Sequence, residues 1–401
     1  MYKILLILIS FNVIASPSYW TITDQSLLNR SVNTDDFDIQ ANHFQLVEFN
    51  QQALSDEVLA NKNNNALITL PLPDGEFEKF TIQQVSIMSA NLAIKYPDFH
   101  TFRGQSFDGS KSLVMDITDK GLHAVIKSPE GTVWIDPINR DSNKLHMSYF
   151  QKDLQNKNTG WQCDINDHDL LPDQDNNKNA STEETLGGTL PVNQLKLKTY
   201  RIAVAATAEY TAFHGGTVQD GMAAIVTAMN RVNGIYEVEV GIRMVLVDNN
   251  DQVVFTNSAT DGYTNSDGFV MLGQNRSILN NVIGFANYDI GHVFSTGGGG
   301  VAGFGVSCGT FKAEGVTGLN SPVNDPFYVD YVAHEIGHQW RGSHIFNATT
   351  NACGGGNRSG TAAVEPGSGS TIMGYAGICG TLNNLQNNSD AYFNSFSLNE
   401  I

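Results

Sequence analysis

The stretch HEIGHQWRGSH, residues 334–344, holds three of the ten histidines of this 401-residue chain together with one glutamate. On a helix, His334 and His338 project from one face, one turn apart, a separation that a single metal ion can bridge. Gly342 can end the helix and turn the chain so that His344 returns to the same point. The spacing therefore predicts a three-histidine metal site.

Three neutral imidazoles leave one coordination position open, which is typical of a catalytic zinc site rather than a structural one. Glu335 lies beside the histidines on the same helix, where it can serve as general base toward water. Redox use of iron or copper would not require that glutamate, so we expect one catalytic Zn²⁺. One alternative places a downstream glutamate such as Glu365, rather than His344, as the third ligand.

The chain as a whole divides into four segments. Residues 1–15 carry Lys3 before an apolar run and are typical of a secretory signal peptide. Short alternating runs between turn residues predict a β-rich region over 16–162. Residues 163–195 form an Asp/Asn-rich linker open to proteolysis. Alternating strands and helices then predict a mixed sheet with packed helices over 196–401.

The composition limits the partners. A net charge of −18, without a dense Lys/Arg run, argues against a nucleic-acid partner. No stretch after the signal peptide approaches the length of a membrane span. We therefore expect a secreted or extracellular protein.

The stretch 334–344 resembles the zinc signature of the metzincin metallopeptidases, and STIMGY, residues 370–375, looks like their Met-turn, with Met373 as a hydrophobic floor under the histidines. The resemblance is closest to the reprolysin (adamalysin) branch, in the form of bacterial secreted reprolysin-like metallopeptidases, over roughly 196–401. It implies an α+β catalytic domain with a twisted mixed sheet, a zinc-binding helix and a Met-turn. It also implies hydrolysis of peptide bonds, in a zymogen whose propeptide, the β-rich region, inhibits the enzyme.

The resemblance extends to residues around the substrate. GFGVSC, residues 303–308, resembles the upper-rim edge strand of that branch, so an extended polypeptide substrate is expected to pair with Gly303, Phe304 and Gly305. Tyr375 either approaches the metal and stabilises the oxyanion or packs as an aromatic residue of the turn. The rival from another class is a secreted zinc-containing binding or adhesion module, or an inactive relative of the proteases.

The two ends of the zinc helix differ in how clearly the sequence marks them. Asp325 and Pro326 predict its start, with Asp325 as N-cap. The family normally has glycine three residues after the second histidine, whereas this chain has Arg341 followed by Gly342. Either Arg341 adopts a left-handed conformation at a cost of about 1–2 kcal/mol, or the turn shifts to Gly342.

Four cysteines allow three disulfide pairings. We prefer Cys353 with Cys379, which would link the loop after His344 to the Met-turn. Cys308 then has no obvious partner. Cys163 could hold the enzyme latent as a thiolate on zinc, as propeptide cysteines do in relatives, although a disulfide or a buried thiol is an equal alternative.

Overall fold

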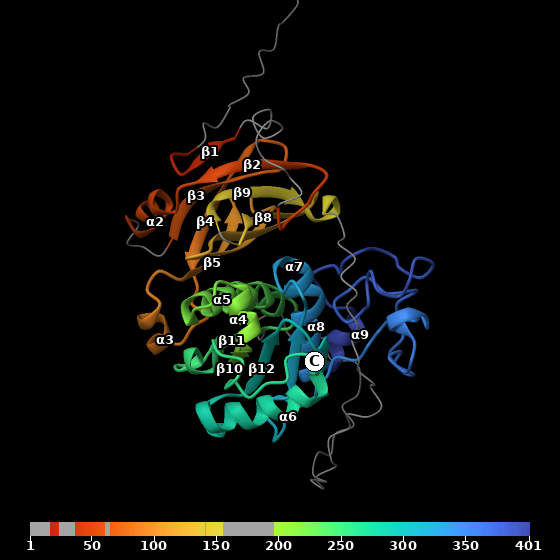
Figure 1. The fold of residues 1–401 in the computed structure, drawn as a ribbon. Coiled ribbons are helices and arrows are strands. Elements are labelled where there is room, and N and C mark those ends of the chain that lie inside the picture. Colours follow the sequence, from red (N-terminus) through yellow and green to blue (C-terminus); the bar gives the residue numbers. More distant parts are fainter. Residues whose placement is uncertain (1–16, 24–36, 61–64, 141, 155–195) are drawn as a thin grey trace, which may run out of the picture. The chain divides into compact units, whose positions relative to one another are not determined.

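A computed structural model describes the chain over residues 17–23, 37–60, 65–140, 142–154 and 196–401 (Figure 1). The predicted signal peptide and linker lie outside these residues. Within them, no helix is both long enough and apolar enough to cross a membrane.

The chain divides into two compact units that do not follow its order. The first comprises Met1–Gln83, Gly104–Leu113 and Ala124–Gln155. The second comprises Gln84–Arg103, Val114–His123 and Asn156–Ile401. Two stretches that precede the predicted linker therefore belong to the same unit as the histidine motif.

The N-terminal half forms a nine-stranded sheet in the order β1-β2-β9-β8-β7-β6-β5-β4-β3. Its strands are β1 (Trp20–Ile22), β2 (Phe44–Phe49), β3 (Asn65–Pro71), β4 (Phe77–Gln84), β5 (His100–Ser106), β6 (Ser112–Thr118), β7 (Gly121–Ser128), β8 (Gly131–Asn139) and β9 (Ser142–Phe150). The pairs β1·β2, β2·β9, β3·β4, β7·β8 and β8·β9 are antiparallel. Helix α2 (Gln51–Ala60) lies between β2 and β3 in the sequence.

Alternating side chains explain part of this sheet. Leu46, Trp134, Met147 and Tyr149 come from β2, β8 and β9 and are buried together in one apolar cluster. Such alternation is expected when one face of an antiparallel sheet covers a core. The described residues thus contain the predicted strands, and the role of this region as a propeptide stays a prediction.

The second unit contains a five-stranded sheet in the order β11-β10-β12-β14-β13. Its strands are β10 (Lys198–Ala206), β11 (Ile242–Leu246), β12 (Ile290–Ser295), β13 (Gly300–Ala302) and β14 (Gly315–Gly318). Strand β10 runs parallel to β11 and β12, β12 runs parallel to β14, and β13 is antiparallel to β14. The predicted mixed sheet is confirmed.

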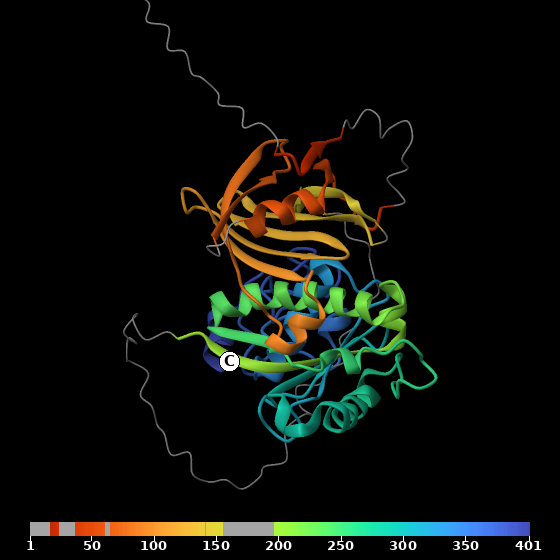
Figure 2. The same cartoon turned by 90° about the vertical axis from the view of Figure 1, so that its left-hand side faces the viewer.

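Helices cover both faces of this sheet. The helices of this unit are α3 (Ala90–Lys95), α4 (Ala208–Phe213), α5 (Val218–Glu239), α6 (Gly268–Leu279), α7 (Asn324–Phe327), α8 (His334–Gln339) and α9 (Ser395–Glu400). Helices α5 and α6 lie on opposite faces (Figures 1 and 2). A capping box between Thr217 and Asp220 starts α5, and sixteen consecutive residues from Gly221 to Tyr236 are buried. The apolar side chains of this long buried helix belong to the same core cluster as Ile336 of the histidine motif.

The histidine motif lies at the end of one continuous helical run that consists of α7, the π-helical segment η7 (Tyr328–Ala333) and α8. The predicted N-cap is wrong, because the run begins at Asn324 and Val323 precedes it without a side-chain cap. The Asp325 carboxylate instead lies 3.0 Å from Nε of Arg231, with both side chains buried. An ion pair inside the core thus takes the carboxylate that the sequence assigned to the helix end.

Candidate metal centre

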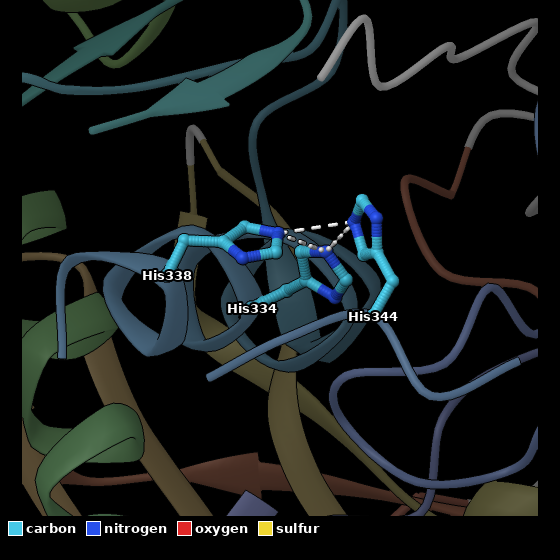
Figure 3. A group of neighbouring side chains, drawn as sticks. All are labelled: His334, His338 and His344. Atoms are coloured by element: carbon cyan, nitrogen blue, oxygen red, sulfur yellow. Dashed lines mark hydrogen bonds between the residues drawn. The ribbon is translucent and has the colours of Figure 1, made fainter. Parts of the chain in front are cut away.

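The three predicted ligands converge. The Nε2 atom of His338 lies 3.0 Å from the Nε2 atoms of both His334 and His344, and the latter two are 3.2 Å apart. All three side chains are buried. Figure 3 shows two rings rising from the helix and the third, from the loop beyond it, turned toward them. Of the residues that the structure describes, these form the group whose donor atoms lie close enough to hold a metal ion.

Backbone carbonyl groups orient all three rings. Each Nδ1 atom lies 2.7 Å from a main-chain oxygen: His334 from that of Ile372, His338 from that of Gly342 and His344 from that of Asn357. A carbonyl oxygen only accepts hydrogen bonds, so each Nδ1 carries the proton and each Nε2 keeps a free lone pair. Three lone pairs facing one another repel unless a cation lies between them. The tautomers therefore favour metal binding.

The rings are also held neutral, as metal ligands must be. Burial lowers the pKa of His334 to about 4. Burial, followed by the proximity of the neighbouring rings, lowers the pKa values of His338 and His344 well below the ordinary value. Proton competition for the lone pairs is therefore weak near neutral pH.

The spacing fits zinc. Zn–N bonds of about 2.0–2.1 Å in tetrahedral geometry place two ligand nitrogens about 3.3 Å apart. The Nε2 atoms here are 3.0–3.2 Å apart. Three imidazoles are a donor set that suits this ion and leaves a fourth position for another ligand.

Arg341 ends the zinc helix in the left-handed conformation, with φ of 83°. Its N–H donates to the carbonyl of His338, and the N–H of Gly342 donates to that of Gly337, both at 2.8 Å. These two bonds form a Schellman motif. The first of the two alternatives is therefore correct: the turn stays at Arg341, and the chain still returns His344 to the site.

A carboxylate near the C-terminus holds the loop that carries the third ligand. The N–H and Oγ–H of Ser343 donate to the two carboxylate oxygens of Glu400, each at 2.8 Å. Glu400 lies in α9, and Ser343 directly precedes His344. This contact was not predicted, because no local sequence pattern joins residues 57 positions apart.

The carboxylate of Glu365, the alternative third ligand, is hydrogen-bonded to other groups. It accepts hydrogen bonds from the Ser370 N–H at 2.8 Å, from Thr371 Oγ at 2.9 Å and from Asn394 Nδ2 at 2.9 Å. These donors lie in the chain just before Met373 and at the start of α9. Glu365 therefore orders this turn, and its carboxylate does not belong to the group of converging nitrogen atoms.

Met373 lies in the turn that packs against the zinc helix. The Gly374 N–H donates to the Thr371 carbonyl at 2.8 Å, which closes the turn. Met373 is fully buried, and a Cβ atom added to Gly337 would lie only 2.5 Å from its sulfur. Glycine at position 337 thus permits the helix to approach the turn. The role of Met373 as a floor under the rings stays a prediction.

Two further predicted site residues lie beside the ligands. Glu335 is fully buried in α8 next to His334. Tyr375 is 2% exposed, with its ring centre 5.5 Å from that of His334 and 4.7 Å from that of His344. It also packs on Phe346 at 4.3 Å. Both readings of the tyrosine fit this position.

The predicted substrate strand needs correction. The edge strand is β13, Gly300–Ala302, and it ends before Gly303. Gly303, Phe304 and Gly305 lie in the bend that follows, where Gly305 has a φ of 65° and its N–H donates to the His338 carbonyl at 2.9 Å. A glycine-rich sequence suits both an edge strand and a left-handed turn, so the sequence did not separate the two.

The preferred disulfide is confirmed, since Cys353 and Cys379 are bonded with their Cα atoms 5.1 Å apart. Cys308 is a free, exposed thiol. The possible latency thiol Cys163 lies outside the described residues.

The family comparison agrees with this geometry. A model described as metallo-peptidase family M12B, reprolysin-like, matches residues 196–401. No curated protein matches the chain significantly. The family match begins just before β10, ends at the last residue and includes all three ligands, Glu335 and the Met373 turn. Because it covers just over half of the sequence, the chain belongs to the reprolysin-like metallopeptidases of family M12B.

Proposed function

We propose that this metallopeptidase is a secreted zinc endopeptidase, made as a zymogen, that hydrolyses internal peptide bonds with Glu335 as general base. The observation that carries the proposal is the convergence of three unprotonated Nε2 atoms within 3.0–3.2 Å of one another. A structural zinc site is usually closed by four protein ligands, whereas three leave a position for water or substrate.

Each residue of the site would have a separate role. His334, His338 and His344 would hold the metal, and bound Zn²⁺ would supply a Lewis acid that polarises the substrate carbonyl and acidifies water. Glu335 would accept the proton of the attacking water and return it to the leaving amine. Tyr375 is the candidate donor of a hydrogen bond to the developing oxyanion. The buried surroundings strengthen each of these interactions, because the local dielectric constant is low.

The substrate is proposed to be an extended polypeptide. Strand β13 is the outer strand of the five-stranded sheet, and an outer strand offers backbone groups to an added strand. The bend at Gly303–Gly305 is hydrogen-bonded to the end of the zinc helix, so the two features are close in the fold. A peptide paired near β13 would thereby run past the metal.

The rival function is a binding module, or an inactive relative, with a purely structural zinc. A glutamate buried next to a ligand speaks against it, because a structural site has no use for a base. Casein hydrolysis should be measured, after cleavage of the chain within 163–195, for the wild type with and without a chelator and for Glu335→Gln. We expect the variant to keep its zinc and lose activity by about 10²–10⁴-fold. Equal activity in all three samples would refute the proposed function.

Secretion and zymogen processing are proposed from the apolar first 15 residues and the Asp/Asn-rich segment 163–195. N-terminal sequencing of protein recovered from the culture medium tests both. New N-termini near residue 16 and within 163–195 are expected. Recovery of the uncut chain inside the cells alone would contradict this part of the proposal.

A further inference from the structure

Two stretches of the N-terminal half, Gln84–Arg103 and Val114–His123, belong to the compact unit that holds the metal centre. Both lie outside 196–401, the range that the family model matches. We infer that these stretches are a permanent structural part of the peptidase unit, so that cutting the chain within 163–195 does not release the N-terminal fragment. The inference is independent of the proposed hydrolysis, since it concerns association of the two fragments. For the proposed zymogen it implies that activation does not require release of the N-terminal fragment.

The first stretch extends the five-stranded sheet. The Leu246 N–H donates to the Ile87 carbonyl at 2.8 Å, and the Ser89 N–H donates to the Leu246 carbonyl at 3.0 Å. Met88 thus forms a parallel bridge with Leu246, the last residue of β11. Because β11 is otherwise an outer strand, the stretch satisfies backbone groups at the sheet edge.

The same stretch contributes apolar side chains to the core of the peptidase unit. They belong to the cluster that contains the buried side chains of β10 and α5, and each is at most 6% exposed: Ile87, Met88, Leu92, Tyr96 and Phe99. Loss of the fragment would expose these five residues together with the surfaces that they cover. Because exposure of buried apolar side chains to water is unfavourable, these five residues favour a state in which the fragment stays bound to the rest of the unit.

The polar face of α5 is also completed from the N-terminal half. Asp116 is fully buried and accepts hydrogen bonds from Thr227 Oγ at 2.7 Å and Asn230 Nδ2 at 3.2 Å. Arg103 donates to both carboxylate oxygens of Glu237, at 3.0 and 3.1 Å, and to Asn230 Oδ1 at 2.7 Å. A buried partner left without its hydrogen bonds is strongly unfavourable, so the network opposes separation.

Backbone approach and surface charges point the same way. A Cβ atom on Gly234 would lie 2.6 Å from Val114, so α5 needs glycine where this stretch crosses it. Two ion pairs of 2.7 Å lie at the periphery of the contact: Lys95 with Asp251 and Lys120 with Asp220. The N-terminal stretches and the residues that they contact in 196–401 are thus complementary in shape and in charge.

The test uses the full chain with a recognition sequence for a site-specific protease inserted within 163–195. After complete cleavage, size-exclusion chromatography in 0.5 M salt, which screens the peripheral ion pairs, should give one peak at the position of the uncut chain. Separation of the two fragments should require urea. Two separate peaks in buffer without urea would overturn the inference.

Matched variants identify what holds the fragment. Arg103→Ala removes the contacts to α5, whereas Arg140→Ala changes an exposed arginine of the first unit, in the same fragment. In intermediate urea, we expect the cut Arg103→Ala protein to separate at least about tenfold faster than wild type and the cut Arg140→Ala protein to match wild type. Equal rates for both variants would overturn the inference in this form. Circular dichroism of the uncut variants verifies that they fold.

Discussion

Removal of the Glu400 carboxylate should weaken metal binding, although this residue is not a ligand. Glu400→Ala deletes two hydrogen bonds to Ser343, each 2.8 Å long and each to a charged acceptor. Two such bonds at a partly exposed position are together worth roughly 1.5–3 kcal/mol. Without them, the loop that carries His344 samples positions in which the third nitrogen is absent from the site.

A smaller population of binding-competent protein lowers the apparent affinity in proportion. The loss of roughly 1.5–3 kcal/mol converts to about 10- to 150-fold weaker zinc binding. Competition with a chromophoric chelator at neutral pH measures this ratio directly. Glu400→Gln, which retains one acceptor oxygen, should give an intermediate value.

A double-mutant cycle tests whether the contact itself is responsible. Ser343→Ala removes one of the two bonds in the wild type but removes nothing in the Glu400→Ala background. The two substitutions should therefore combine to less than the sum of their separate effects. Unchanged zinc affinity in a folded Glu400→Ala protein, or strict additivity, would refute the reasoning.

Three further outcomes are expected. His344→Ala should abolish stoichiometric zinc in the purified protein. Glu365→Gln should retain one zinc per chain and only lower the melting temperature. Loss of zinc from Glu365→Gln alone would favour the alternative in which Glu365, rather than His344, is the third ligand. Arg341→Gly should relieve the left-handed strain of about 1 kcal/mol and raise the melting temperature by roughly 2–4 °C. A melting temperature below that of the wild type would contradict the Schellman description. Burial by itself would raise the pKa of Glu237, but hydrogen bonds and charges of the neighbouring arginines lower this pKa overall. The ionised carboxylate therefore stabilises the fold above the unfolded pKa of about 4.5, and this stabilisation is lost as the pH falls through the folded pKa. Urea denaturation between pH 7 and pH 3 should accordingly show a smaller loss for Glu237→Gln than for wild type, and identical pH profiles would contradict this assignment.

The sequence predicted what depends on short spacing. His334 and His338 lie one turn apart, and the step from there to His344 is six residues, so local geometry nearly fixes their meeting point. The strands of the mixed sheet were visible for the same reason, as continuous apolar runs.

The contacts that the sequence did not reveal join distant residues. Glu400 is 57 positions from Ser343, and Arg103 is 134 positions from Glu237. The misassigned Asp325 belongs to the same class, because its partner Arg231 lies far away in the chain. Local helix rules gave the carboxylate a capping role, and a buried ion pair overrode them.

The hydrogen bonds from the three imidazoles to main-chain carbonyl groups have a consequence for which substitutions the site tolerates. Since carbonyls at positions 342, 357 and 372 fix the rings, any amino acid at those positions supplies the same acceptor. The hydrogen bonds there depend on the path of the polypeptide, whereas packing separately limits the side chain at Gly342 and at the fully buried Ile372. Substitutions that keep this backbone path can therefore change side chains around the three histidines without changing the orientation of the rings.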